Sequence, residues 1–208
     1  MKVLIGCEES QAVCIEMRKK GHESFSCDVL PCSGGHPEWH IKDDVLKHLD
    51  DGWDMGIFFP PCTFLTTSAN KYYLSNPKRW QNRLDAVMFV WKLWTANIPK
   101  IAIENPKGVL SSHIRKPDQI VHPYYFGDLY EKATCLWLKN LPKLCYNTED
   151  DMFYQKTSVD PEIIYYNSKK TKSGKSKYSK FGKLGKGKGY ERSKTPLGFA
   201  IAMAEQWG

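Results

Sequence analysis

Short apolar runs that alternate with helical spacing constrain the fold of this chain more than any other feature of its sequence. Val3–Ile5 is a β-branched strand candidate, residues 12–20 have the spacing of a helix, and Gly21 stands where a helix ends. Glu23–Cys27 then indicates a second strand. Such a strand, helix and strand fit a right-handed parallel crossover, which places Asp28 at the ligand-binding edge of a sheet.

The same alternation returns further along the chain. Trp53–Phe59 is a buried strand candidate that Pro60 and Pro61 stop, because proline donates no ladder hydrogen bond. Residues 79–94 have helical spacing, and residues 100–103 form a strand that ends at Glu104. We therefore predict an α/β fold with a doubly wound, mostly parallel sheet, with the loops at Cys62 and Glu104 on one edge of it.

The pattern divides the chain into four parts. Residues 1–119 carry the α/β core, and residues 120–167 form a small substrate-side region with short antiparallel or irregular strands such as Thr134–Leu138. Residues 168–194 are a basic, low-complexity segment with almost no apolar side chains to bury, so we expect this segment to be flexible. Residues 195–208 predict an amphipathic helix that returns to the core.

Positive charge is concentrated in that basic segment. The whole chain has 30 Lys and Arg against 23 Asp and Glu, for a formal net charge of +7, while residues 169–194 hold ten Lys and one Arg against one Glu. The remaining body is mildly acidic, which favours a polyanionic partner, nucleic acid first, over a solvated linker. The lysines predicted to contact phosphates are Lys175, Lys177, Lys180, Lys183, Lys186 and Lys188.

Composition also indicates the compartment. The chain has no apolar run of about 18 residues and no signal-like start, so we expect a soluble cytoplasmic protein without membrane contact. Seven cysteines without a regular framework favour reduced thiols over disulfides. No obligate protein partner is evident from the sequence.

Two proline-bounded motifs carry the candidate chemistry. Cys62 follows Pro60-Pro61 and is a candidate nucleophile, although a free cysteine is more often a small buried apolar residue. Glu104 leaves a buried strand toward Pro106, where a helix cap or a solvated acid is the alternative. Asp28 and Asp44 follow earlier strands, so four loop residues are expected in one crevice.

These residues, in this order, resemble the DNA (cytosine-5) methyltransferases. Pro61-Cys62 is similar to the catalytic Pro-Cys loop, Glu104-Asn105-Pro106 to the Glu-Asn-Val loop, and Asp43-Asp44-Val45 to the Gly-Asp-Val turn. Residues 192–204 resemble the last family segment, a polar turn and an alanine-rich helix. The chain is most similar to the short members often encoded by phages, and it has little length for a separate target-recognition domain.

The resemblance implies a Rossmann-like fold that binds S-adenosylmethionine and methylates cytosine carbon 5 in DNA. Cys62 would add to carbon 6 of a flipped cytosine, and Glu104 would bind ring nitrogen 3 and the exocyclic amine, which requires a raised pKa. Asp28 would bind the ribose, Asp44 the adenine amine, and Val29 the adenine face. The other cofactor-binding residues expected are Gly6, Glu8, Ser10 and Pro61.

The chain departs from the family pattern at two motifs. Residues 5–10 replace the Phe-x-Gly-x-Gly cofactor loop, retaining Gly6 and a small Ser10 but introducing Glu8 and Glu9. The Gln-x-Arg-x-Arg segment that supports the flipped base is absent in that form. Arg115 with Gln119 is the substitute we predict, and an ordinary surface arginine is the alternative.

Other readings of the sequence stay open. One is a non-catalytic nucleic-acid-binding protein, and another is a carbon 5 methyltransferase that acts on RNA or a free pyrimidine nucleotide. Amino-directed methyltransferases need Asp, Asn or Ser where Phe59 stands, so the loop favours carbon methylation. A zinc site at Cys27, Cys32, His36 and His40 is disfavoured, and we expect no metal.

Overall fold

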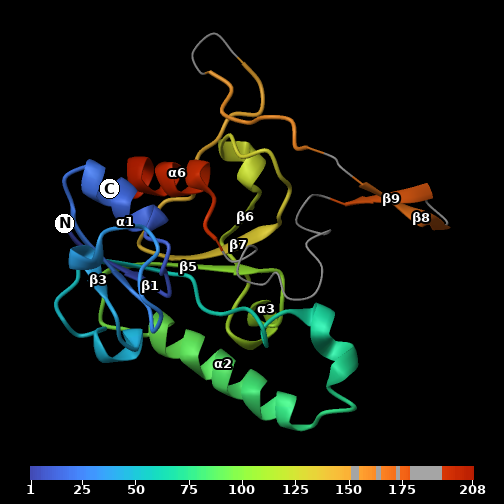
Figure 1. The fold of residues 1–208 in the computed structure, drawn as a ribbon, viewed down its shortest axis with the longest axis horizontal. Helices are drawn as coiled ribbons and strands as arrows, with labels where there is room; N and C mark the ends of the chain where they lie inside the picture. Colours follow the sequence, from blue (N-terminus) through green and yellow to red (C-terminus); the bar gives the residue numbers. More distant parts are fainter. Residues whose placement is uncertain (151–154, 163–164, 172–173, 179–193) are drawn as a thin grey trace.

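A seven-stranded sheet forms the centre of the molecule in a computed structural model that describes residues 1–150, 155–162, 165–171, 174–178 and 194–208. The strand order is β3-β2-β1-β4-β5-β7-β6 (Figure 1). The strands are β1 (Lys2–Gly6), β2 (Glu23–Cys27), β3 (His40–Ile41), β4 (Met55–Phe58), β5 (Lys100–Pro106), β6 (Gln119–Val121) and β7 (Thr134–Lys139).

The direction of the strands confirms the predicted doubly wound architecture. β1 pairs in parallel with both β2 and β4, β2 with β3, and β4 with β5, whereas β7 is antiparallel to β5 and β6. The chain leaves β1 toward β2 and β3 on one side, and continues to β4 and β5 on the other. Ligands bind such sheets at this reversal, outside the carboxyl ends of the strands.

Helices cover both faces of the sheet. In Figure 1, α1 (Ala12–Lys19) and α6 (Leu197–Trp207) lie above the sheet and α2 (Lys78–Trp94) lies below it. Gly21, at a φ of +85°, ends α1 as predicted, because a left-handed residue there suits glycine. The shorter elements are α3 (Leu110–His113) and the 3-10 turns η1 (Pro37–Trp39), η2 (Val45–Lys47), η3 (Thr67–Tyr72) and η4 (Pro123–Phe126).

Side chains that alternate along the strands supply two apolar layers. Val3 and Ile5 pack in the cluster that includes α1 and α6, whereas Leu4 packs in the cluster that includes α2. The central strands β1 and β4 are buried on both faces, which is why they read as continuous apolar runs in the sequence. The sheet is therefore a rigid support for the loops at its edge.

The basic segment differs from its prediction over the residues that the structure describes. Residues expected to lack regular structure form an antiparallel hairpin of β8 (Tyr165–Thr171) and β9 (Gly174–Tyr178), which projects away from the main sheet in Figure 1. The Tyr and Thr residues of these strands have high β propensity, which the low apolar content of the segment does not reveal. Lys175 and Lys177 lie on β9, and Lys180, Lys183, Lys186 and Lys188 lie outside the described residues.

One face of α2 also differs from a simple amphipathic pattern. The helix buries Arg83, Val90 and Leu93, while Trp80, Leu84, Met88 and Trp91 stay exposed. Apolar spacing in the sequence identified the helix correctly, but it could not separate the core-facing stripe from this exposed one.

Among the described helices, none has the length and apolar character needed to cross a membrane.

Candidate active site

The loops that follow β4 and β5 are bonded to each other at the carboxyl edge of the sheet. The Asn105 side-chain amide donates to the carbonyl of Pro60 over 2.8 Å, and the N–H of Val109 donates to the carbonyl of Leu65 over 2.8 Å. Gly108 permits this approach, because a Cβ atom there would lie 2.1 Å from the Leu65 carbonyl oxygen. The predicted neighbourhood of the two loops is therefore built by direct contacts.

A buried arginine on α2 supports the first of these loops. Arg83 donates from Nε to the carbonyl of Phe64 over 2.8 Å and from Nη2 to the carbonyl of Thr66 over 3.0 Å. The same Nη2 donates to the Asn70 side-chain oxygen over 2.9 Å, and the guanidinium lies 4.1 Å from the centre of the Tyr73 ring. A planar donor fork suits this task, because it binds several carbonyls while fully buried.

Cys62 occupies the exposed part of that loop. Its carbonyl accepts hydrogen bonds from the N–H groups of Leu65 and Thr66, at 3.0 and 3.2 Å, which fixes the turn that carries the side chain. Cys62 itself is exposed, whereas Cys14, Cys27 and Cys135 are buried. The exposure of Cys62 argues against its role as a small core residue and leaves its thiol accessible to a substrate.

Glu104 lies in the part of β5 that extends beyond its pairing with β4. Its side chain is mostly buried in a small hollow that it shares with Phe59, Lys132 and Thr195. Burial raises the pKa of the Glu104 carboxyl, which Lys132, with Nζ 3.9 Å from Oε1, and then the Thr134 hydroxyl partly offset. The direction of this shift is the one that the resemblance requires of this residue.

The segment that begins α6 completes this hollow. Thr195, Pro196 and Phe199 line it opposite Phe59 and Glu104, so the end of the chain returns to the sheet edge as the sequence predicts. Gly198 lies under the Phe126 carbonyl, which a Cβ atom would approach to 1.9 Å. Burial raises the pKa of the Asp128 carboxyl beside this turn, and the N–H groups of Gly198 and Phe199 partly offset that shift.

A second group of carboxylates gathers beyond the ends of β2 and β3, near Cys7 after β1. Burial raises the pKa of the Cys7 thiol, and the charges of Asp28 and Asp44 raise it further, so both acids lie near that thiol. Asp28 Oδ1 accepts from the N–H of Leu30, and Asp44 Oδ1 accepts from the N–H of Leu46. Acceptor capacity remains on both carboxylates, and Val29 beside them is 67% exposed.

The loop at residues 6–11 differs from what the family pattern implies. The Glu8 carboxylate is buried and accepts from the N–H groups of Val13 and Cys14, at 2.8 and 3.3 Å, so it caps α1 instead of facing the crevice. The α-carbon of Gly6 faces the Phe58 ring, which a Cβ atom would approach to 2.5 Å. Ser10 is partly buried, and its carbonyl oxygen lies beside Gly34, where a Cβ atom would approach it to 2.6 Å.

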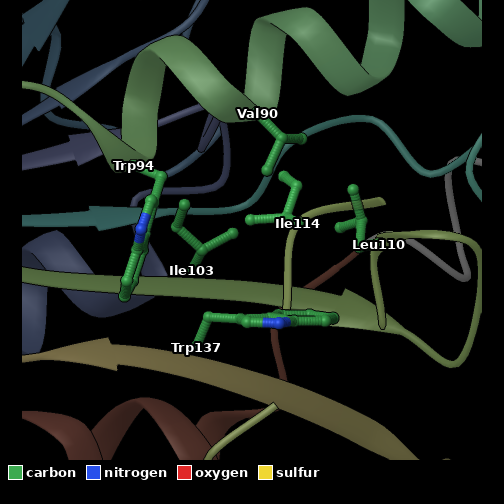
Figure 2. A pocket seen from close by; sticks show the side chains of 6 residues that line it. All are labelled: Val90, Trp94, Ile103, Leu110, Ile114 and Trp137. Atoms are coloured by element: carbon green, nitrogen blue, oxygen red, sulfur yellow. The ribbon is translucent and has the colours of Figure 1, made fainter. Parts of the chain in front are cut away.

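Arg115 lies on the other face of β5 from Glu104. Figure 2 shows an apolar hollow on the α2 face, lined by Val90, Trp94, Ile103, Leu110, Ile114 and Trp137. The Arg115 carbonyl accepts from the Trp137 indole over 2.7 Å, and its guanidinium lies over the Trp94 ring and binds Asp118 through two 2.7 Å hydrogen bonds. The structure therefore does not bring Arg115 to the Cys62 and Glu104 loops.

Gln119 has a structural task of its own. Its amide donates to the Leu144 carbonyl over 2.8 Å and accepts from the Leu144 N–H over 2.9 Å.

Sequence reasoning missed Arg83 and Lys132, since nothing distinguishes a buried helix arginine or a lysine before a strand from ordinary surface residues. Their roles follow from which loops the sheet brings together.

The described residues hold no group of three or more His, Cys, Asp or Glu that could bind a metal ion. Three of the four side chains in the disfavoured zinc set have other contacts. Cys27 Sγ donates to the Asp43 carbonyl, His40 bonds to Ser26 and to the Leu30 carbonyl, and His36 stacks on Trp39.

Comparison with family models and with curated proteins finds no match. Among solved structures, the chain is similar to a protein encoded within an E. coli prophage and described as a candidate DNA modification methyltransferase. The sequence identity is 14% and the TM-score is 0.44. The alignment covers 82% of this chain and 59% of that one, so the chain spans about three fifths of the length of that protein.

The buried cap of α1 predicts a dependence of stability on pH. Burial raises the pKa of Glu8 from 4.5 to about 8, although the two N–H groups favour the charged form. Stability from this group is thus fully present below pH 4.5 and is lost as the pH rises through about 8. Glu8→Gln, which stays neutral, should gain stability relative to the wild type between these values, by up to about 5 kcal/mol.

Urea unfolding at both ends of this pH range measures the difference between the two proteins. Glu205→Gln, which removes an exposed carboxylate, serves as the matched control and should track the wild type. A difference between Glu8→Gln and the wild type that stays constant with pH contradicts the assigned burial of the charge.

Proposed function

We propose that the protein transfers a methyl group from S-adenosylmethionine to carbon 5 of a cytosine in DNA, with Cys62 as the nucleophile. The observation that carries the proposal is the bonded pair of loops after β4 and β5. They hold an exposed thiol and a mostly buried glutamate of raised pKa on neighbouring strands. A nucleophile beside an acid that can protonate a ring is what carbon methylation of a pyrimidine needs.

The carboxylates beyond the ends of β2 and β3 suit a nucleoside without a pyrophosphate. Doubly wound sheets that bind dinucleotides place the pyrophosphate at the N-terminus of the first helix. Here the Glu8 carboxylate already binds the N–H groups of Val13 and Cys14. Asp28 and Asp44 remain as acceptors for ribose hydroxyls and an adenine amine, with exposed Val29 for the ring face.

S-adenosylmethionine, when bound, supplies a methyl group on a positively charged sulfur. Cytosine carbon 5 is too weak a nucleophile to accept it directly, so the Cys62 thiolate first forms a bond to carbon 6, and the electron pair of the 5,6 double bond becomes available at carbon 5. Glu104 donates a proton toward ring nitrogen 3 and accepts from the exocyclic amine, so charge on the ring is neutralised. Carbon 5 would then form a bond to the methyl group as the methyl–sulfur bond breaks, which leaves a neutral thioether on the cofactor. Loss of the carbon 5 proton to a base would then expel the Cys62 thiolate.

DNA is the substrate that the charge distribution favours. Ten lysines in residues 169–194 supply phosphate contacts, and the hairpin of β8 and β9 carries several of them away from the sheet. The target base must leave its stack to reach a thiol on a loop at the sheet edge. We leave Arg115 and Gln119 out of the proposed base-binding set because their side chains are bonded internally.

The proposal predicts that Cys62→Ser abolishes methyl transfer. Serine is a poor nucleophile toward carbon 6, so incorporation of labelled methyl groups into cytosine-containing DNA should fall by about a thousandfold or more. Cys145→Ser, which also replaces an exposed cysteine, should retain wild-type activity. Turnover by Cys62→Ser at the wild-type rate contradicts the mechanism.

The cofactor assignment is tested separately by calorimetry with S-adenosylmethionine. We expect the wild type to bind it and Asp28→Ala to bind about 10- to 100-fold more weakly, since a hydrogen bond to a charged group is lost. Asp50→Ala removes an exposed carboxylate elsewhere and should bind normally. No heat from the wild type at millimolar cofactor contradicts the proposal, and equal binding by Asp28→Ala contradicts the role of that residue.

A further inference from the structure

Lys132 shares the hollow of Glu104 without belonging to any motif in the sequence. Its Nζ lies 3.9 Å from Glu104 Oε1, and three quarters of its side chain is buried. The lining of the hollow combines the ammonium group, the carboxyl, the hydroxyl-bearing Thr134 and Thr195, and the ring of Phe59. A carboxyl and an ammonium group that share a hollow with an aromatic ring can recognise the polar edge of a base. The carboxyl can exchange a proton, whereas the ammonium can only donate.

The edge of cytosine presents three polar groups in a row. They are the exocyclic amine, which donates, and then ring nitrogen 3 and the oxygen on carbon 2, which both accept. A neutral Glu104 carboxyl can accept from the amine and donate to nitrogen 3, but it has nothing left for the oxygen. The next group along must therefore be a donor, and the Lys132 ammonium has three N–H groups to offer.

We infer that Lys132 donates to the oxygen on carbon 2 of the flipped cytosine, beside Glu104. This inference rests on the proposed function and adds the residue that the absent Gln-x-Arg-x-Arg segment leaves unassigned. When the Cys62 thiolate adds to the ring, negative charge spreads onto nitrogen 3 and this oxygen. The ammonium is then placed where the charge develops, so it contributes to the rate as well as to binding.

The contact is tested by combining a modified base in the DNA with a substitution of Lys132 in the protein. Fluorescence anisotropy measures binding to duplexes that carry one mismatched cytosine, 2-thiocytosine or abasic position, because a mismatched base flips at low cost. We expect the wild type to bind cytosine about tenfold more tightly than 2-thiocytosine, whose sulfur is a weak acceptor. Lys132→Met should lose this preference, and Lys132→Arg should keep part of it.

Lys116→Met, which changes an exposed lysine elsewhere, is the matched control and should behave as the wild type. A Lys132→Met protein that melts normally and still prefers cytosine over 2-thiocytosine overturns the role of Lys132 alone. If the wild type binds the cytosine and abasic duplexes equally well, base binding is overturned, and with it the proposed function. Thermal melting of each variant separates a lost contact from a lost fold.

The exposed face of α2 carries a second, independent inference. Trp80, Leu84, Met88 and Trp91 recur every three or four residues, so they form one stripe, and each is between 45% and 58% exposed. A large apolar side chain buries roughly 150 to 250 Å² when fully covered. The four therefore leave about 400 Å² open, which is within the range of patches that are often functional.

A second copy of the chain fits this stripe by area and by charge. Two stripes packed together cover about 800 Å², and the side chains beside them bring the total toward the ~1,200 Å² of specific interfaces. Asp85 and Lys92 are exposed, lie on the same margin of the stripe and are two helical turns apart. In an antiparallel pair centred near Met88, Asp85 of each copy faces the partner subunit's Lys92.

We infer that the protein forms a twofold dimer through antiparallel packing of α2. Light scattering during size-exclusion chromatography should then give twice the chain mass of 24.0 kDa. Lys92→Glu brings a glutamate next to Asp85 at both ends of the twofold interface and should weaken the dimer at least tenfold. The double variant Asp85→Lys with Lys92→Glu exchanges the two charges and should restore the dimer. Met88→Glu should abolish it.

A wild type that stays at 24.0 kDa at all accessible concentrations overturns the dimer. A dimer that survives Met88→Glu, or that the exchanged pair fails to restore, overturns this packing of the helices. If the wild type is monomeric and Met88→Glu weakens DNA binding, the stripe belongs to the substrate surface instead.

Discussion

Hydrogen bonds to a proline-rich loop hold the candidate active site together. Pro60 and Pro61 have no N–H groups, so β4 cannot continue its ladder and the carbonyls beyond it need donors from elsewhere. Asn105 supplies one from β5, and Arg83 supplies two from α2. The position of Cys62 relative to Glu104 thus depends on a side-chain amide and a buried guanidinium, neither of which touches the substrate in our account.

The sheet separates two chemical environments along one edge. The ends of β2 and β3 carry Asp28 and Asp44 near the Cys7 thiol, whose pKa burial raises. The ends of β4 and β5 carry Cys62 and Glu104, and Lys132 reaches Glu104 from the segment before β7. The first suits neutral hydroxyl and amine donors, and the second suits a polar ring. Reversal of the strand order between β1 and β4 brings the two regions next to each other, where a donor and an acceptor molecule could meet.

Local sequence patterns predicted β1, β2, β4, β5 and β7, the main helices and the return of the last helix, because apolar runs and glycine at a helix end leave clear signals. The short edge strands β3 and β6 carry no such signal. They could not predict that Glu8 turns inward to cap α1, since charge alone says nothing of direction. The placement of Arg115 on the opposite face from Glu104 depends on the register of β7 with β5, a long-range pairing. The exposed apolar stripe on α2 has the same residue spacing as a buried stripe, so the sequence could not show which of the two faces solvent.

Trapping with DNA that contains 5-fluorocytosine tests the central claim most directly, because fluorine at carbon 5 cannot leave as a proton does and the adduct persists. With S-adenosylmethionine present, we expect the wild type to become covalently attached to this DNA, and peptide mass spectrometry to locate the attachment at Cys62. A protein that binds both the cofactor and the DNA yet forms no adduct would contradict the account, as would an adduct through another cysteine such as Cys145.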